Sequence, residues 1–300
     1  MHTPSLCFLG IGLMGNPMTS RLATSGFALS AWNRDPAKAE ALRPLGVQAR
    51  ADLGEAVEGA DIVISMLANG AVVGQVIAAA IPAMKPGTLW IDMSSTQQGE
   101  ALGFAALLAQ HGMRFMDAPV SGGVAGAAAG TLAIMAGGSV HDFEQAEAVL
   151  APMGRPMLVG PVGSGQVAKL CNQLIVGATI NIVAEALLLA QAAGADPVAV
   201  RAAIRGGFAE SRILELHGQR MLDRNFMPGG QVKSQLKDLN NVLVAAADAG
   251  LTLPVTALVA ERYASIADSL PRADHAAALL ALEQLNPGQR LGGGPDQLPV

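Results

Sequence analysis

The sequence predicts an α/β protein in which a doubly wound parallel sheet is followed by an all-α domain. Three observations support this prediction: strand-like and helix-like segments alternate along the first half of the chain, a glycine-rich turn interrupts the alternation near residue 160, and only helical patterns follow. Such alternation is typical of a parallel sheet covered by helices on both faces. A chain of 300 residues also exceeds what one core usually requires, so two domains are expected.

Five short apolar runs in the first half of the chain predict buried strands, because each is bounded by turn-forming residues. The predicted strands occupy residues 5–10, 29–34, 61–67, 88–94 and 113–120. Helical patterns separate them at residues 14–25, 37–45, 71–80 and 99–111. Edge strands are expected at residues 131–137 and 157–160, with a helix between them at 140–153.

The second half of the chain is expected to contain helices alone. Residues 166–193 form one apolar pattern that is much longer than an average helix, and we expect it to link the domains. Further helical segments follow at residues 197–205, 213–223, 231–249 and 255–267. The turn GPVGSG therefore separates a dinucleotide-binding domain at residues 1–163 from a helical substrate and dimerisation domain at residues 164–290. Residues 291–300 are expected to form a flexible Gly- and Pro-rich tail.

Composition argues against several classes of protein. The formal net charge is −5 and no dense run of Lys or Arg occurs, so nucleic acid is not an expected partner. We expect every apolar stretch to be broken before the length of about 18 residues that a membrane span requires, and we expect no signal peptide. Two cysteines and five scattered histidines suggest a reducing cytoplasm, no disulfide framework and no metal site.

A glycine-rich turn follows the first predicted strand and opens the first predicted helix. Gly10, Gly12 and Gly15 have the spacing of a dinucleotide-binding loop. In such a loop the glycines allow a tight turn, a close approach of the backbone to a pyrophosphate, and close packing of helix on strand. The N–H groups at the start of the helix then bind the phosphates. The sequence therefore predicts a Rossmann-type domain whose cofactor loop comprises Gly10, Ile11, Gly12, Leu13, Met14 and Gly15.

The end of the second predicted strand indicates which nicotinamide cofactor binds. An Asp or Glu at this place would accept hydrogen bonds from the ribose 2′-hydroxyl of NAD. Asn33 has no negative charge that would repel a 2′-phosphate, and Arg34 has a planar guanidinium suited to binding one. The sequence therefore favours NADP, with NAD as the alternative if Arg34 is an ordinary surface residue.

Two further segments contain candidate substrate-binding and catalytic residues. Ser121–Gly123 follow a strand and offer a hydroxyl and backbone N–H groups to a carboxylate, although an ordinary turn would look the same. Lys169 lies in the long apolar helix, with Asn172 and Gln173 on the same face. Partial burial would lower the pKa of Lys169 and suit it to proton transfer, whereas an ammonium group that reaches solvent would have no such role.

Taken together, these motifs resemble the β-hydroxyacid dehydrogenase family, which includes 3-hydroxyisobutyrate dehydrogenase. The resemblance covers nearly the whole chain and rests on the ordered segments FLGIGLMGNPM (8–18), IDMSST (91–96), DAPVSGG (117–123), GSGQVAKLCNQ (163–173) and LKDL (236–239). Within the family, the segments RNFMPGG (224–230) and ADHAAAL (273–279) are most similar to tartronate semialdehyde reductases. Asn33 departs from that group, which often has an acid there, and this puts a preference for NAD in doubt.

The resemblance also implies roles for individual residues. The glycine loop would hold the pyrophosphate, and the residues along the rest of the cofactor would be Met66, Leu67 and Thr96. The substrate carboxylate would be held by Ser121, Gly122 and Gly123. Lys169 would be the general acid and base, Asn172 and Gln173 would orient the substrate beside it, and Lys237 would reach over the nicotinamide end.

The reaction that the resemblance implies is the NAD(P)H-dependent reduction of a short β-oxo acid, tartronate semialdehyde (2-hydroxy-3-oxopropanoate), to D-glycerate. We expect a cytoplasmic homodimer or homotetramer, because one small domain can scarcely cover the long apolar helix. The alternatives are a sibling enzyme for 3-hydroxyisobutyrate, L-serine, threonate or succinic semialdehyde, and a non-catalytic NADP-binding interaction protein. Imine reductases share this architecture but usually lack a lysine at the position of Lys169, and the retained Lys169, Asn172 and Ser121–Gly123 argue against a non-catalytic protein.

Overall fold

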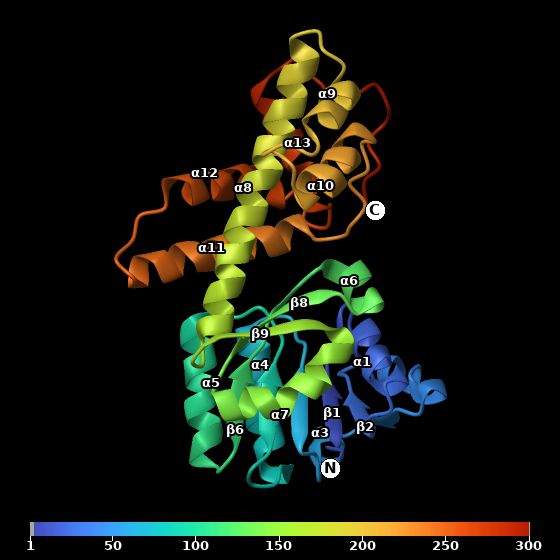
Figure 1. Cartoon of the computed structure of the whole chain (residues 1–300), viewed down its shortest axis with the longest axis vertical. Helices are drawn as coiled ribbons and strands as arrows, with labels where there is room; N and C mark the ends of the chain where they lie inside the picture. Colours follow the sequence, from blue (N-terminus) through green and yellow to red (C-terminus); the bar gives the residue numbers. More distant parts are fainter. Residues whose placement is uncertain (1–2, 300) are drawn as a thin grey trace. The chain divides into compact units, whose positions relative to one another are not determined.

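A computed structural model describes residues 3–299 of the protein (Figure 1). The chain divides into two compact units, Met1–Lys169 and Leu170–Val300. The sequence placed the boundary at residue 163, at the end of the glycine-rich turn. The structural division falls at residue 169 because the first turns of the helix that begins at Ser164 belong to the first unit.

The first unit is built on one sheet, which has nine strands over the described residues. The strands are β1 (Leu6–Leu9), β2 (Leu29–Trp32), β3 (Gln48–Arg50), β4 (Ile62–Ser65), β5 (Leu89–Asp92), β6 (Arg114–Asp117), β7 (Val120–Ser121), β8 (Leu132–Gly137) and β9 (Gly154–Gly160). Their order is β3-β2-β1-β4-β5-β6-β8-β7, and β9 pairs with β8. The first six strands pair in parallel, as predicted, whereas β8 is antiparallel to β6 and β7. The prediction of β8 as an edge strand is wrong, because β8 pairs with three other strands.

Helices cover both faces of this sheet, as the alternating pattern predicted. They are α1 (Gly15–Thr24), α2 (Pro36–Glu40), α3 (Leu53–Val57), α4 (Gly70–Ala80), α5 (Gln98–Gln110), α6 (Gly123–Ala129) and α7 (Val140–Leu150). Successive residues of a strand point to opposite faces. Accordingly, Leu6 and Phe8 belong to a core shared with α1, α2, α6 and α7. Cys7 and Leu9 belong to a second core shared with α3, α4 and α5.

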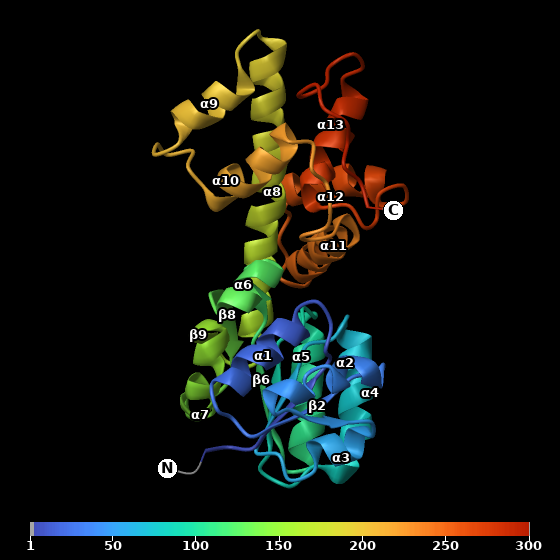
Figure 2. The same ribbon diagram turned by 90° about the vertical axis from the view of Figure 1, so that its right-hand side faces the viewer.

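The described residues of the second unit form helices joined by loops, with no strand among the named elements, as predicted. Its helices are α8 (Ser164–Ala192, which begins in the first unit), α9 (Pro197–Ile204), α10 (Arg212–Leu222), α11 (Val232–Asp248), α12 (Pro254–Ala267) and α13 (Ala278–Leu285). Figure 2 shows α9 and α10 on one side of α8 and the last three helices on the other. The core of this unit forms where they meet α8, at Ile180, Val183, Ala184, Leu187 and Leu188.

Strand β3 and the short helices α3, α6 and α13 were not predicted from the sequence. They contain 3, 5, 7 and 8 residues. Strand alternation is recognisable over about 4–8 residues and a helical period over about 10, so elements of this size leave no clear pattern. The segment predicted as one strand at residues 113–120 is also two strands, β6 and β7, which are separated by Ala118 and Pro119.

Helix α8 contradicts the expectation that every apolar stretch is broken before 18 residues. It is long and apolar enough to cross a membrane by length and composition, with 39% of its most apolar window buried. Core helices of soluble proteins also meet these criteria, so the length and composition of α8 are not by themselves evidence that it crosses a membrane. Ile175, Ile182 and Leu189 lie seven residues apart and are 60, 62 and 68% exposed. The expected homo-oligomer, which would cover these side chains, stays a prediction.

The segment from residue 291, expected to be a flexible tail, is held against the second unit. The guanidinium of Arg224 is buried there and lies 2.6 Å from carboxylate oxygens of both Glu283 and Asp296. The backbone N–H of Gln297 donates to the carbonyl of Arg224. A buried guanidinium is stable only when acidic groups pair with it. The pairing of Arg224 with Asp296 therefore holds this segment in place, although its Gly- and Pro-rich composition suggested flexibility.

Candidate cofactor and substrate site

The glycine loop between β1 and α1 has two crowded glycines and one open one. Gly10 has a φ of 101°, and a Cβ atom there would come within 2.3 Å of the carbonyl oxygen of Met66. A Cβ on Gly15 would come within 1.9 Å of the carbonyl oxygen of Gly10. By contrast, a Cβ on Gly12 would meet no atom within 4 Å. Packing therefore requires glycine at the first and third positions, and the second leaves the backbone open to a ligand.

The start of α1 fits the pyrophosphate of a dinucleotide. Its N-terminal cap is Met14, and no side chain accepts a hydrogen bond from the first turn. Backbone N–H groups at an uncapped helix start favour anions. A pocket of about 640 Å³ opens beside this turn and is lined by Ile11, Gly12, Leu13, Asn16, Pro17, Ala37, Lys38, Ala41 and Val124. Lys38 was not singled out in the sequence, because a lone lysine in a short helix has no distinguishing pattern.

Asn33 and Arg34 follow β2, at the same edge of the sheet as the glycine loop. The Oδ1 atom of Asn33 accepts a hydrogen bond of 2.9 Å from the N–H of Ile11, and its Nδ2 atom donates to the carbonyl of Asp35. Asn33 thus fixes the glycine loop, a contribution that the sequence did not reveal. Arg34 is exposed. Its guanidinium is therefore accessible to an anionic group of a ligand.

Met66, Leu67 and Thr96 follow β4 and β5. The carboxyl ends of neighbouring parallel strands lie at one edge of a sheet, so these residues share that edge with the glycine loop. The N–H of Leu67 donates to Ser94 Oγ over 2.9 Å. The hydroxyl of Thr96 is buried and has no hydrogen-bond partner in the described part of the chain. A buried hydroxyl without a partner is costly, so this atom fits a contact with a bound polar ligand.

Two buried carboxyl groups lie on neighbouring strands at this edge, because Asp92 and Asp117 are paired in the register of β5 and β6. Burial raises the pKa of Asp92 to about 6, although hydrogen bonds from Ser94 and Ser65 oppose the shift. Burial also raises the pKa of Asp117, against the hydrogen bonds that it accepts from backbone N–H groups. The two carboxyl groups therefore lie in a poorly solvated environment in which hydrogen bonds are strong.

Asp117 fixes the start of α8. Its Oδ1 accepts a hydrogen bond of 2.6 Å from the N–H of Gly163, and its Oδ2 accepts one of 2.8 Å from the N–H of Gln166. A carboxylate at the N-terminus of a helix satisfies N–H groups that lack partners within the helix. Asp117 was not among the predicted site residues. The only signal in the sequence was an acid at the end of an apolar strand.

Lys169 lies one turn beyond this cap and is 8% exposed. Its Nζ atom donates a hydrogen bond of 2.9 Å to the carbonyl of Val120, the residue directly before Ser121. Gly122 and Gly123 have φ values of 138° and 62°, and a Cβ on Gly123 would meet no atom within 4 Å. The structure thus brings the ammonium group next to a segment of open backbone, both within the first unit.

The other predicted site residues, Asn172, Gln173 and Lys237, lie in the second unit and belong to one polar network. Asn172 Nδ2 donates to Gln173 Oε1 over 2.8 Å, and Gln173 Nε2 donates to Asp238 Oδ2 over 2.7 Å. Lys237 Nζ lies 3.1 Å from the other oxygen of Asp238. Gln235, which is 1% exposed, accepts a further hydrogen bond from Gln173. Neither Asp238 nor Gln235 was among the predicted site residues, because the Gln173 side chain that contacts both lies far away in the sequence.

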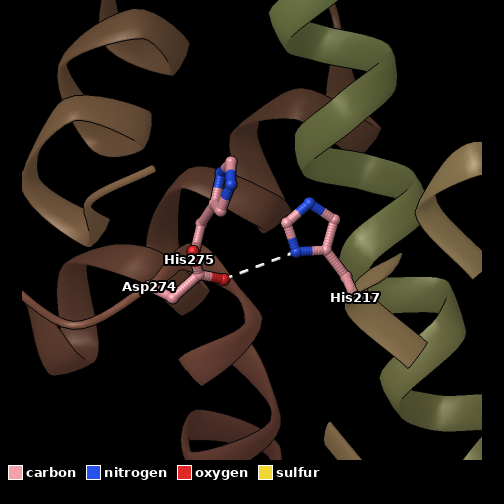
Figure 3. A group of neighbouring side chains, drawn as sticks. All are labelled: His217, Asp274 and His275. Atoms are coloured by element: carbon pink, nitrogen blue, oxygen red, sulfur yellow. Dashed lines mark ion pairs between the residues drawn. The ribbon is translucent and has the colours of Figure 1, made fainter. Parts of the chain in front are cut away.

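A separate group in the second unit resembles a metal site in composition. The side chains of His217, Asp274 and His275 offer ligand atoms within 4.8 Å of one another (Figure 3). However, the carboxylate of Asp274 already accepts hydrogen bonds from the N–H groups of residues 229, 230 and 276. The guanidinium of Arg220 also lies 3.4 Å from it and would repel a cation. The group therefore fits an ionic cluster that holds the loop at residues 229–230.

Comparisons with known families agree with the two-part division of the chain. Residues 5–163 match the family described as the NAD binding domain of 6-phosphogluconate dehydrogenase. Residues 163–282 match the family described as the NAD-binding domain of NADP-dependent 3-hydroxyisobutyrate dehydrogenase. The two matches meet in the turn that precedes α8.

Individual relatives cover nearly the whole chain. A 2-hydroxy-3-oxopropionate reductase of Escherichia coli is 41% identical over 93% of this chain and 97% of its own length. A 2-(hydroxymethyl)glutarate dehydrogenase of Eubacterium barkeri is 32% identical over 96% of this chain and 97% of its own length. Among solved structures, the 3-hydroxyisobutyrate dehydrogenase of Mycobacterium tuberculosis with L-serine has a TM-score of 0.88 and 33% identity, covering 94% of this chain and 99% of its own.

The glycine loop yields a prediction that separates packing from ligand binding. Gly15→Ala should lower the free energy of unfolding by about 1–3 kcal/mol, because its methyl group would overlap the Gly10 carbonyl. Gly12→Ala is the matched control, with open space around its Cβ, and should change stability by less than about 0.5 kcal/mol. Gly12→Ala should nevertheless weaken NADPH binding, because its methyl group would occupy the space through which the ligand approaches the backbone. Urea denaturation and fluorescence titration measure the two effects, and equal stability of both variants would contradict the analysis of the loop.

Proposed function

Because the chain belongs to the 3-hydroxyisobutyrate dehydrogenase-like family of NAD(P)-dependent β-hydroxyacid dehydrogenases, we propose that it reduces tartronate semialdehyde, a short β-oxo acid, to D-glycerate. The observation that supports a catalytic role most directly is the hydrogen bond from Lys169 to the carbonyl of Val120. It holds an ammonium group beside Ser121–Gly123, a segment suited to binding a carboxylate. The choice of tartronate semialdehyde is supported by the similarity to the Escherichia coli reductase of 2-hydroxy-3-oxopropionate, which is the same compound.

The proposed binding mode uses the Ser121 hydroxyl and the backbone N–H groups of Gly122 and Gly123 to hold the substrate carboxylate. Gly123 leaves room for this approach, because no atom lies within 4 Å of where its Cβ would be. The β-carbonyl oxygen of the substrate then faces Lys169 Nζ. Asn172 follows three residues later on the same helix face and orients the substrate.

The proposed chemistry transfers one hydride and one proton. When bound, the nicotinamide supplies the hydride that the carbonyl carbon accepts. Lys169 donates a proton from Nζ to the carbonyl oxygen as its C=O double bond becomes a single bond, and the resulting amine regains a proton from solvent. Before the transfer, the positive charge on Nζ stabilises the negative charge that develops on the oxygen. The Val120 carbonyl keeps the ammonium group in place for this step.

The separation between carboxylate and carbonyl yields a prediction about substrates. Tartronate semialdehyde and methylmalonate semialdehyde have one carbon between the two groups, whereas succinic semialdehyde has two. The longer spacing should displace the carbonyl and lower kcat/KM by about 10²-fold. We expect tartronate semialdehyde to be the best of the three with saturating NADPH. A preference for succinic semialdehyde would refute the substrate assignment, and NADPH binding without turnover of any β-oxo acid would favour a non-catalytic protein.

Removal of the Lys169 ammonium group should affect turnover far more than cofactor binding. Lys169→Ala is expected to lower kcat by at least about 10²-fold, the usual scale for loss of a general acid, while NADPH affinity stays near that of the wild type. Lys85→Ala is a suitable control, since Lys85 forms a surface ion pair with Asp61 outside the site. Steady-state kinetics and NADPH titration give both quantities. Near-normal turnover of Lys169→Ala would remove this residue from the mechanism.

We further propose that NADP is the preferred cofactor. The support is the uncharged side chain of Asn33, the exposed guanidinium of Arg34, and Lys38 in the lining of the pocket beside the glycine loop. The two cations Arg34 and Lys38 would attract a 2′-phosphate, and the uncharged Asn33 would not repel it.

Arg34→Ala tests the cofactor proposal. It should weaken NADPH binding by about 1–3 kcal/mol, the scale of charge-assisted hydrogen bonds, and leave NADH binding unchanged, because only NADPH has the phosphate. Arg155→Ala serves as a control, because Arg155 lies on β9, far along the strand order from β2. Titration of each variant with both cofactors measures the difference. An equal loss of affinity for NADH and NADPH would show that Arg34 has a structural role instead.

A further inference from the structure

The side chain of Gln166 joins the start of α8 to the loop that follows β5. Gln166 is fully buried in the first unit. Its Nε2 atom donates a hydrogen bond of 2.9 Å to the carbonyl of Ser94, and its Oε1 atom accepts one of 3.0 Å from the N–H of Thr96. Both partners are backbone groups with fixed donor and acceptor roles. The orientation of the Gln166 amide is therefore determined, and reversing it would break both hydrogen bonds.

The loop that Gln166 holds contains candidate cofactor-binding groups. Thr96 has the buried hydroxyl without a partner, and Ser94 Oγ accepts a hydrogen bond from the N–H of Leu67. One amide side chain thus fixes Thr96 directly and Leu67 through Ser94. These two residues follow different strands, β5 and β4, so Gln166 ties two loops of the candidate cofactor site to one helix.

The helix turn that bears Gln166 has little freedom to shift. The N–H of Gln166 is bound to the carboxylate of Asp117. A Cβ atom on the preceding residue, Gly165, would lie 2.3 Å from the carbonyl oxygen of Met135 and 2.7 Å from an Asp117 oxygen. Because these contacts are so close, the first turn of α8 can pack against the sheet in only one position. Lys169 follows three residues later, and its ammonium group is bound to the Val120 carbonyl.

We propose that Gln166 is a positioning residue for the reaction: its amide keeps the cofactor-binding loop at Ser94–Thr96 at a fixed separation from Lys169. This inference rests on the proposed function, in which the hydride comes from the cofactor beside the Ser94–Thr96 loop and the proton comes from Lys169, and both reach the same carbonyl group. Hydride transfer depends steeply on geometry, and a displacement of about 1 Å lowers rates by about 10²-fold. The side-chain amide of Gln166 bonds only to backbone groups and lies one turn from the proton donor, so it controls such a displacement without touching the substrate.

Two substitutions at this position distinguish the hydrogen bonds from the volume of the side chain. Gln166→Met keeps the length but removes both hydrogen bonds. Gln166→Glu keeps an acceptor for the Thr96 N–H, and its carboxyl group can donate to the Ser94 carbonyl only when it is protonated. Burial raises the pKa of a carboxyl group, so protonation of this glutamate is expected within an accessible pH range. The matched controls are Gln110→Met and Gln110→Glu, at an exposed residue that ends α5.

We expect Gln166→Met to lower kcat by about 10- to 100-fold with a much smaller change in substrate KM. The isotope effect with 4-deuterated NADPH should rise, because a displaced hydride makes the chemical step slower. For Gln166→Glu, kcat relative to wild type should increase by about fivefold or more as the pH falls from 8.5 to 6, as the donor to Ser94 returns. The same ratio should stay constant for Gln166→Met, which has no group to titrate.

A second readout is independent of turnover. Amide hydrogen exchange of Thr96 in the NADPH-bound protein should accelerate about tenfold or more in Gln166→Met, and it should stay slow in Gln166→Glu, which retains the acceptor. Should Gln166→Met fail to fold, the pH profile and the Thr96 exchange of Gln166→Glu decide the question.

Three results would overturn the proposal. The first is a wild-type kcat in Gln166→Met. The second is faster Thr96 exchange in that variant with an unchanged kcat, because Gln166 would then be purely structural. The third is a loss of activity in Gln166→Glu that does not depend on pH. Failure of the proposed function is recognised separately, because the wild-type protein would then turn over none of the semialdehydes, and the positioning role would fall with it.

Discussion

The rest of the site depends on the carboxylate of Asp117, which caps the start of α8 inside the first unit. A buried carboxylate without hydrogen bonds would cost several kcal/mol, so the N–H groups of Gly163 and Gln166 must lie where they do. Gly137 and Gly165 leave no space around it, since a Cβ on either would lie within 2.7 Å of an Asp117 oxygen. The position of Lys169, which lies one turn later on α8 within the first unit, is set from this cap.

The candidate site combines open backbone with a few oriented side chains. Gly12 and Gly123 each leave space where a Cβ atom would be, so anionic groups of a ligand can approach the main chain there. Asn33 and Gln166 bond to backbone atoms of neighbouring loops, Lys169 bonds to the backbone of strand β7, and these bonds hold the segments in place. In this arrangement the main chain provides the binding surfaces, and the side chains determine where those surfaces lie relative to one another.

The sequence predicted the elements whose pattern is long and regular. The parallel strands β1, β2, β4, β5 and β6, the long helix α8 and the helical second unit all follow the expected order. Short elements such as β3 and α3 left no readable period. The docking of the C-terminal segment was missed for another reason: Arg224 and Asp296 are 72 residues apart, and an ion pair over that distance leaves no local pattern.

For the site, the sequence by itself determined the residues whose chemistry depends on local spacing. The glycines at 10, 12 and 15 and the lysine in an apolar helix belong to this class, because one turn or one helix face is enough to define them. Only the tertiary structure decided that Asp117 caps α8, that Asn33 bonds to the glycine loop, and that Gln166 holds Thr96. Gln166 and Thr96 are 70 residues apart in the chain, and such partners meet only after the strands between them have packed into one sheet.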